Sequence, residues 1–115
     1  MNRTAIAKFC RSLPAVTMAI QWGDHQVYKV GGKMFAVISA RGLSFKANEV
    51  AFEMLVETGL ARPSPYMAQA KWLYVDDPAG FDVKDLRGYL AASHALVAKK
   101  LTRKAQRELG LALAP

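Results

Sequence analysis

Few side chains in this sequence could perform catalysis. The candidates are one cysteine, Cys10, two histidines, His25 and His94, and several serines. Nucleophilic catalysis needs a nucleophile, a base and an orienting group that converge, and neither Gly-x-Ser-x-Gly nor His-Glu-x-x-His occurs in the sequence. Cys10 falls on the apolar stripe of an expected helix, where a cysteine usually packs as a small hydrophobic residue. We therefore expect no enzymatic activity.

The same inventory argues against a metal site. One cysteine and two histidines cannot supply the four Cys or His ligands of a structural zinc site. Four aspartates cluster in the sequence, namely Asp76, Asp77, Asp82 and Asp85. Acids are ordinary in a turn that leads into a helix, because they favour the positive end of the helix dipole. We expect neither a metal nor another cofactor.

Basic residues offer a different chemistry, the neutralisation of phosphates. The chain carries a net charge of +7, and residues 99–115 contribute five basic residues against Glu108 alone. The five are Lys99, Lys100, Arg103, Lys104 and Arg107. Such asymmetry favours polyanionic partners, with nucleic acid first and an anionic membrane second. A solvated helix face that only keeps the protein soluble is an equally good interpretation.

A second set of phosphate contacts could come from the expected sheet. Lys46 ends one expected strand, and Lys71 precedes Trp72 in another, with Tyr66 and Tyr74 nearby. Aromatic and basic side chains grouped in this way can stack on bases and touch phosphates. A tryptophan on a strand nevertheless packs more often in the core than against a ligand.

These residues must be positioned by a sheet, and the strongest sheet signal is a hairpin. Two β-rich runs between Gln26 and Ser39 flank Gly31-Gly32, which predicts a tight turn that needs positive φ. The expected cross-strand pairs are Val30 with Lys33, Lys29 with Met34, Tyr28 with Phe35 and Val27 with Ala36. Both faces would then be mostly apolar, so the second face needs a cover, a partner or a ligand.

The remaining elements follow from periodicity, caps and breakers. In the first half of the chain we expect a helix over 4–12 capped by Thr4, strands over 16–22 and 43–46, and a helix from Asn48 to Thr58 that buries Val50, Met54 and Leu55. An irregular segment over 61–65, around Pro63 and Pro65, should follow. We then expect a strand over 71–75, a long helix from Asp82, and a short basic helix between Thr102 and Gly110. The chain is thus expected to form a single α+β domain over 1–115, with an antiparallel five-stranded sheet, helices on one side and a basic C-terminal segment over 102–115.

Several segments together resemble the MmcQ/YjbR family of small bacterial proteins. They are Leu13-Pro14-Ala15-Val16-Thr17, Val30 to Ala36, Leu43 to Lys46, Pro65-Tyr66-Met67 with Lys71-Trp72, and Ser93 to Leu101. The resemblance covers roughly Thr4 to Leu111 and implies a CyaY-like fold and DNA binding. Family members often carry polar or basic residues where this chain has Ala68, Gln69 and Ala70, so Lys71 is the only basic residue kept in that loop.

Two functions follow as hypotheses. The first is non-enzymatic DNA binding of low or unknown sequence specificity, through Lys46, Lys71, Trp72, Lys99, Lys100, Arg103, Lys104 and Arg107. The alternative is a module for protein interaction, homodimerisation or small-ligand binding that uses an apolar sheet face. The lone cysteine and the lack of a long apolar stretch lead us to expect a cytoplasmic protein with no membrane partner.

Overall fold

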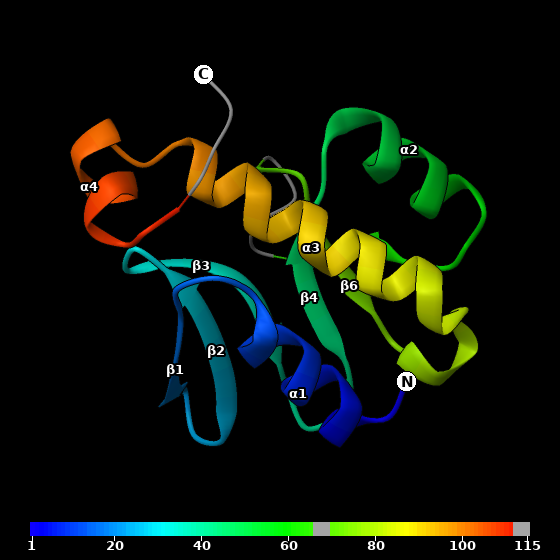
Figure 1. Cartoon of the computed structure of the whole chain (residues 1–115). Helices are drawn as coiled ribbons and strands as arrows, with labels where there is room; N and C mark the ends of the chain where they lie inside the picture. The colour runs from blue at the N-terminus through cyan, green and yellow to red at the C-terminus, as the bar shows by residue number, and fades with distance from the viewer. Residues whose placement is uncertain (66–69, 112–115) are drawn as a thin grey trace.

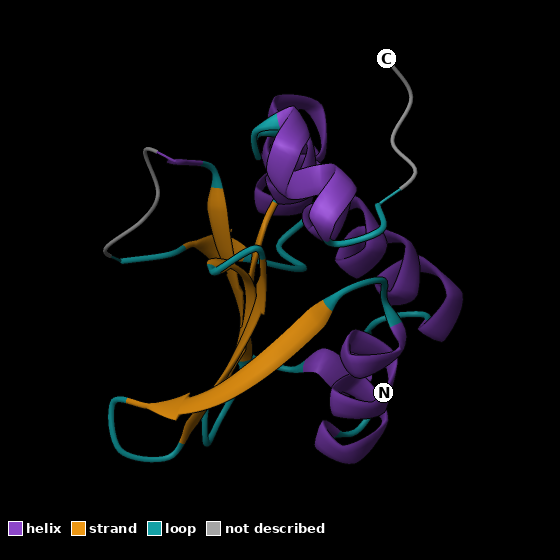
Figure 2. Ribbon diagram, turned by 60° about the vertical axis from the view of Figure 1, so that its left-hand side comes forward, coloured by secondary structure: helices purple, strands orange, loops and turns teal. Residues whose placement is uncertain are grey.

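A computed structural model describes residues 1–65 and 70–111. Helices cover one face of a single antiparallel sheet, as Figure 1 and Figure 2 show. Tyr66, from the aromatic grouping, and the last four residues of the 102–115 segment lie outside the described residues. Within the described ranges, no helix is both long and apolar enough to cross a membrane.

The sheet has six strands in the order β1-β2-β3-β4-β6-β5. Their bounds are β1 Val16–Gln21, β2 His25–Val30, β3 Lys33–Ile38, β4 Leu43–Lys46, β5 Arg62–Pro63 and β6 Trp72–Val75. The meander of four strands is confirmed, but the prediction of five strands and of an irregular 61–65 segment is wrong. The short β5 pairs with β6 at the edge of the sheet, where a proline without an N–H is tolerated.

The helices are α1 Arg3–Ser12, α2 Glu49–Glu57, α3 Val83–Lys99 and α4 Arg103–Glu108, with a short 3-10 helix, η2, over Pro78–Gly80. Side chains of Asn48, Asp82 and Thr102 accept hydrogen bonds from the first turns of α2, α3 and α4. These three caps confirm the predicted helix starts. At α1 the cap is Asn2, which accepts from the Ala5 N–H at 2.8 Å, so the assignment of Thr4 was wrong.

The buried face of α2 also differs from the prediction. Leu55 is buried, but Val50 is 77% exposed and Met54 is 44% exposed. Instead, Phe52 and Val56 pack against the core beside Leu55. Because α2 is short and contacts the sheet near β5, only a narrow stripe of it is covered, and the apolar residues outside that stripe remain in solvent.

A β-bulge shifts the central pairing. Val30 pairs with Lys33 and Lys29 with Met34, as predicted, but Tyr28 pairs with Ala36 and Val27 with Val37. Phe35 is therefore the extra residue of β3, and Phe35 and Ala36 both belong to the main core. The predicted pairs of Tyr28 with Phe35 and of Val27 with Ala36 are wrong, because two-residue alternation does not pass through a bulge. Val37 now lies on the face opposite the helices.

Candidate nucleic-acid interface

The face of the sheet opposite the helices has no covering helix in the described chain (Figure 2). The strand registers place Val37, Ser44, Tyr74 and Arg62 side by side in one row across β3, β4, β6 and β5. The turn between β1 and β2 projects from the sheet on this same side. We call this surface the open face.

Part of the open face is filled by a small apolar cluster. Val27, Val37 and Trp72 are buried together, and Met34 packs against them. Trp72 is only 6% exposed. The structure therefore places this predicted nucleic-acid contact inside a cluster, where its ring is already covered by neighbours.

A groove of about 650 Å³ lies on the open face. It is lined by Trp22, His25, Met34, Val37, Ser39, Ser44, Arg62, Ser64, Pro65 and Tyr74. The floor is the row of strand residues described above, and the turn that follows β1 forms one wall. The volume falls within the range of about 300–1,000 Å³ that is typical of ligand pockets.

Trp22 is the exposed aromatic residue of this groove. Its side chain belongs to the three-residue connection between β1 and β2 and is 61% exposed. The backbone of Trp22 has φ +50°, a left-handed conformation that is unfavourable for a bulky residue. The rings of Trp22 and His25 lie nearly perpendicular to each other, with an interplanar angle of 89° and centroids 6.2 Å apart. The turn thus holds a large aromatic ring in solvent at a conformational cost.

Polar groups interrupt the apolar lining. The Nδ1 atom of His25 is buried without a hydrogen-bond partner in the described chain, and the nearest carboxylate oxygen, from Asp24, is 3.6 Å away. The hydroxyl-bearing side chains of Ser44 and Ser64 also line the groove. The two serine hydroxyls could pair with the polar edge of a bound ring, since polar groups in an apolar pocket orient a ligand.

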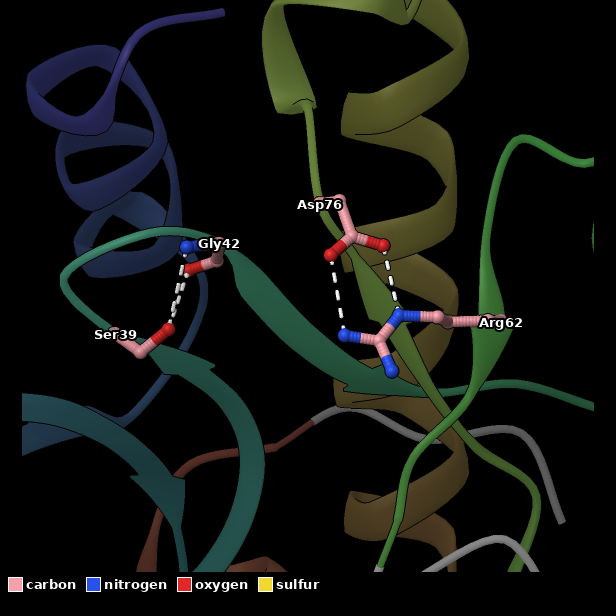
Figure 3. A network of polar contacts seen from close by, with 4 residues as sticks. All are labelled: Ser39, Gly42, Arg62 and Asp76. Carbon is pink, nitrogen blue, oxygen red and sulfur yellow. Dashed lines mark hydrogen bonds and ion pairs between the residues drawn. The ribbon is translucent and has the colours of Figure 1, made fainter.

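Two further polar contacts stiffen the rim of the groove (Figure 3). Arg62 donates from Nε and Nη2 to both carboxylate oxygens of Asp76, at 2.8 and 3.1 Å, and its guanidinium lies 4.7 Å from the centre of the Tyr74 ring. The pairing lowers the pKa of the exposed Asp76 carboxyl, first through the hydrogen bond from Arg62. On the other rim, the Ser39 hydroxyl donates to the Gly42 carbonyl at 3.2 Å.

The predicted cations gather mainly at one end of the molecule. The side chain of Leu101, between α3 and α4, lies against Gly31, so α4 sits beside the β2–β3 turn (Figure 1). Exposed basic side chains flank this contact in the chain: Lys33 at the start of β3, Lys99 and Lys100 at the C-terminal end of α3, and Arg103, Lys104 and Arg107 in α4. We call this surface the basic end.

Lys46 connects the basic end to the sheet. Burial, followed by the neighbouring ammonium of Lys100, lowers the pKa of Lys46. Two cations 54 positions apart in sequence are thus neighbours. Lys71 lies next to Lys46 through the backbone, since its carbonyl accepts from the Ala47 N–H, but its ammonium sits 5.0 Å from the centre of the Phe52 ring.

Two of the three residues considered for catalysis, Cys10 and His94, are buried in the fold, whereas His25 lines the groove. Cys10 is buried, and burial raises the pKa of its thiol to about 12. The His94 Nε2 lies 2.7 Å from the Pro14 carbonyl, which can only accept, so this nitrogen carries a proton. In the described ranges, no group of three or more His, Cys, Asp or Glu side chains is placed to hold a metal ion.

Trp22 and Arg62 are not among the predicted site residues. Trp22 ends the expected strand over 16–22, and Arg62 lies in the expected irregular segment over 61–65. The available signal was a large aromatic residue directly before Gly23-Asp24, where a turn was already expected. Nothing local pointed to Arg62, because its partners Tyr74 and Asp76 lie on another strand and the turn that follows it.

Comparisons with known proteins agree with the architecture. The YjbR family model matches residues 11–96. A crystal structure of the Deinococcus radiodurans protein DR2400, with a DUF419 domain, superimposes with a TM-score of 0.83 and 25% sequence identity, covering 94% of this chain and 87% of that one. No curated protein sequence matches.

Proposed function

This chain belongs to the YjbR family, and we propose that it is a non-enzymatic protein that binds nucleic acid through its basic end. One observation carries the proposal: the exposed bases of α3 and α4 gather where Leu101 packs on Gly31, and Lys46 of the sheet neighbours Lys100 there. Two ammonium groups held together repel each other, and a phosphate placed between them would relieve that repulsion. A polyanion is the partner whose charge fits this arrangement.

The composition of the basic end sets the expected mode of binding. Its cations are exposed lysines and arginines, and the only acid in α4, Glu108, lies 3.9 Å from Lys104. Contacts between such side chains and phosphates give affinity without direct sequence information. We therefore propose binding of low sequence specificity, in which Lys46, Lys100 and the α4 cations neutralise about five phosphates.

Salt dependence tests this proposal directly. Fluorescence anisotropy of labelled DNA, measured at several salt concentrations, should give a slope of log K against log salt of roughly −4 to −5 for a duplex and about −3.5 for a single strand. In the Lys100→Gln variant the slope should become shallower by about 1, because one phosphate contact is lost.

A matched control comes from the other end of the same helix. Lys84 is exposed near the start of α3, so Lys84→Gln removes the same charge far from the basic end. Its slope should equal that of the wild type. If both variants made the slope shallower by the same amount, only net charge would matter and the basic end would be no specific site. No binding at low salt would refute the proposal.

A further inference from the structure

We propose that the groove on the open face receives one unpaired nucleobase of a bound single strand, stacked against Trp22. This inference rests on the proposed function and adds a ligand class, a planar heteroaromatic ring, to a site that the basic end does not include. The open face combines an available aromatic surface, polar groups for the edge of the base, and cations for its phosphates.

The aromatic surface is Trp22. Its ring is 61% exposed, whereas the other tryptophan, Trp72, is 6% exposed and already packed. Left-handed backbone at a bulky residue such as Trp22 is unfavourable and persists where the surrounding structure demands it, often at ligand clamps. Base stacking on an aromatic side chain tolerates any base, which matches binding of low specificity.

The polar groups suit the edge of a base. A nucleobase combines an apolar face with hydrogen-bond donors and acceptors at its rim, and the groove combines Met34 and Val37 with Ser44 and Ser64. The His25 ring lies next to Trp22 in the same groove. The groove of about 650 Å³ has room for one base and its sugar.

The charges favour a base that remains attached to a strand. Alternation along β2 puts Lys29 on the open face with Val27, and alternation along β4 puts Lys46 there with Ser44. Lys29 pairs with Met34, which lines the groove, and Lys46 also meets Lys100 of the basic end. A strand could therefore pass from the basic end to the groove with cations along its path. A base within a duplex is stacked on both sides and could enter only by leaving the stack.

The test follows the intensity and the anisotropy of tryptophan emission in the same sample. An oligothymidine of about twelve nucleotides, long enough to span a typical single-strand site, is titrated into the protein at low salt. We expect anisotropy to rise while Trp22 emission is quenched and becomes shielded from acrylamide. A duplex of the same length should raise the anisotropy without quenching. The experiment is done on the wild type, in which Trp72 is shielded, and repeated in a Trp72→Phe background.

Variants in the β1–β2 hairpin separate stacking from folding. Trp22→Ala should weaken binding of the single strand about tenfold and leave duplex binding unchanged, since stacking contributes about 1–3 kcal/mol per base. Trp22→Phe should recover part of the loss. Ile20→Ala is the matched control, because Ile20 is 56% exposed in the same hairpin but does not line the groove.

The outcomes distinguish this inference from the proposed function. If the oligothymidine raises the anisotropy but leaves Trp22 emission unchanged, the groove inference falls and nucleic-acid binding stands. If no oligonucleotide binds, both fall. Equal quenching by thymidine monophosphate at the same base concentration would assign the groove to a free nucleotide instead of a strand. A change in emission with protein concentration alone would assign it to a second copy of the chain.

Discussion

The Ser93 hydroxyl takes the place of a direct backbone hydrogen bond between β3 and β4, and removing it should lower the unfolding free energy. Its Oγ donates to the Phe35 carbonyl at 2.6 Å and accepts from the Lys46 N–H at 3.0 Å, so it bridges β3 and β4 beside the bulge. In Ser93→Ala both backbone groups lose this partner, and Ser93 is fully buried. An unsatisfied buried polar group costs about 1–3 kcal/mol. We expect a total loss of about 2–4 kcal/mol of unfolding free energy, because Lys46 is only partly buried.

A second serine gives the matched control. The Ser12 hydroxyl also donates to a phenylalanine carbonyl, that of Phe9, at the same 2.6 Å, but this contact is exposed. Ser12→Ala should therefore change stability by less than about 0.5 kcal/mol, as water replaces the hydroxyl. Urea unfolding followed by circular dichroism gives both values. A loss in Ser93→Ala no larger than that in Ser12→Ala would refute the bridging role.

Three further predictions concern other positions. Burial raises the pKa of Cys10 from 9.0 to about 12, so the thiol of the unfolded chain ionises first, and its contribution to stability is kept below pH 9 and lost as pH rises toward 12. Cys10→Ala should therefore flatten the fall in unfolding free energy above pH 9. Native Cys10 should also resist a thiol reagent at pH 8 until urea unfolds the chain. Gly42→Ala should destabilise by more than about 1 kcal/mol, because its Cβ would lie 2.5 Å from the Val75 carbonyl oxygen and the backbone cannot give way easily. Gly88→Ala, in α3 with nothing within 4 Å of the new Cβ, should instead stabilise by about 0.5–1 kcal/mol in the same thermal or urea unfolding assay.

Local signals in the sequence predicted most of the fold. The Gly31-Gly32 turn and the helix starts at Asn48, Asp82 and Thr102 depend on neighbours in sequence, and the structure confirms them. The failures depend on distant contacts. The exposure of Val50 follows from where α2 meets the sheet, and β5 exists only because β6 is there to pair with it.

The candidate site was less predictable than the fold for the same reason. The cluster of five C-terminal cations was visible in the sequence, but its contact with Lys46 depends on how α3 crosses the sheet. The groove joins Trp22, Ser44 and Arg62 from three separate strands and turns. No spacing in the sequence records that juxtaposition, because it arises from the register of four antiparallel pairs.

The bulge at Phe35 also has a consequence for comparing this chain with its relatives. The extra residue reverses the order in which core-facing and solvent-facing side chains alternate along β3. An alignment without a gap to a relative with a regular strand would therefore match core-facing positions of one chain to solvent-facing positions of the other. Ser93 supplies hydrogen bonds next to that extra residue. We therefore expect the inserted position in β3 and a hydroxyl at position 93 to occur together, and to be lost together, across the family.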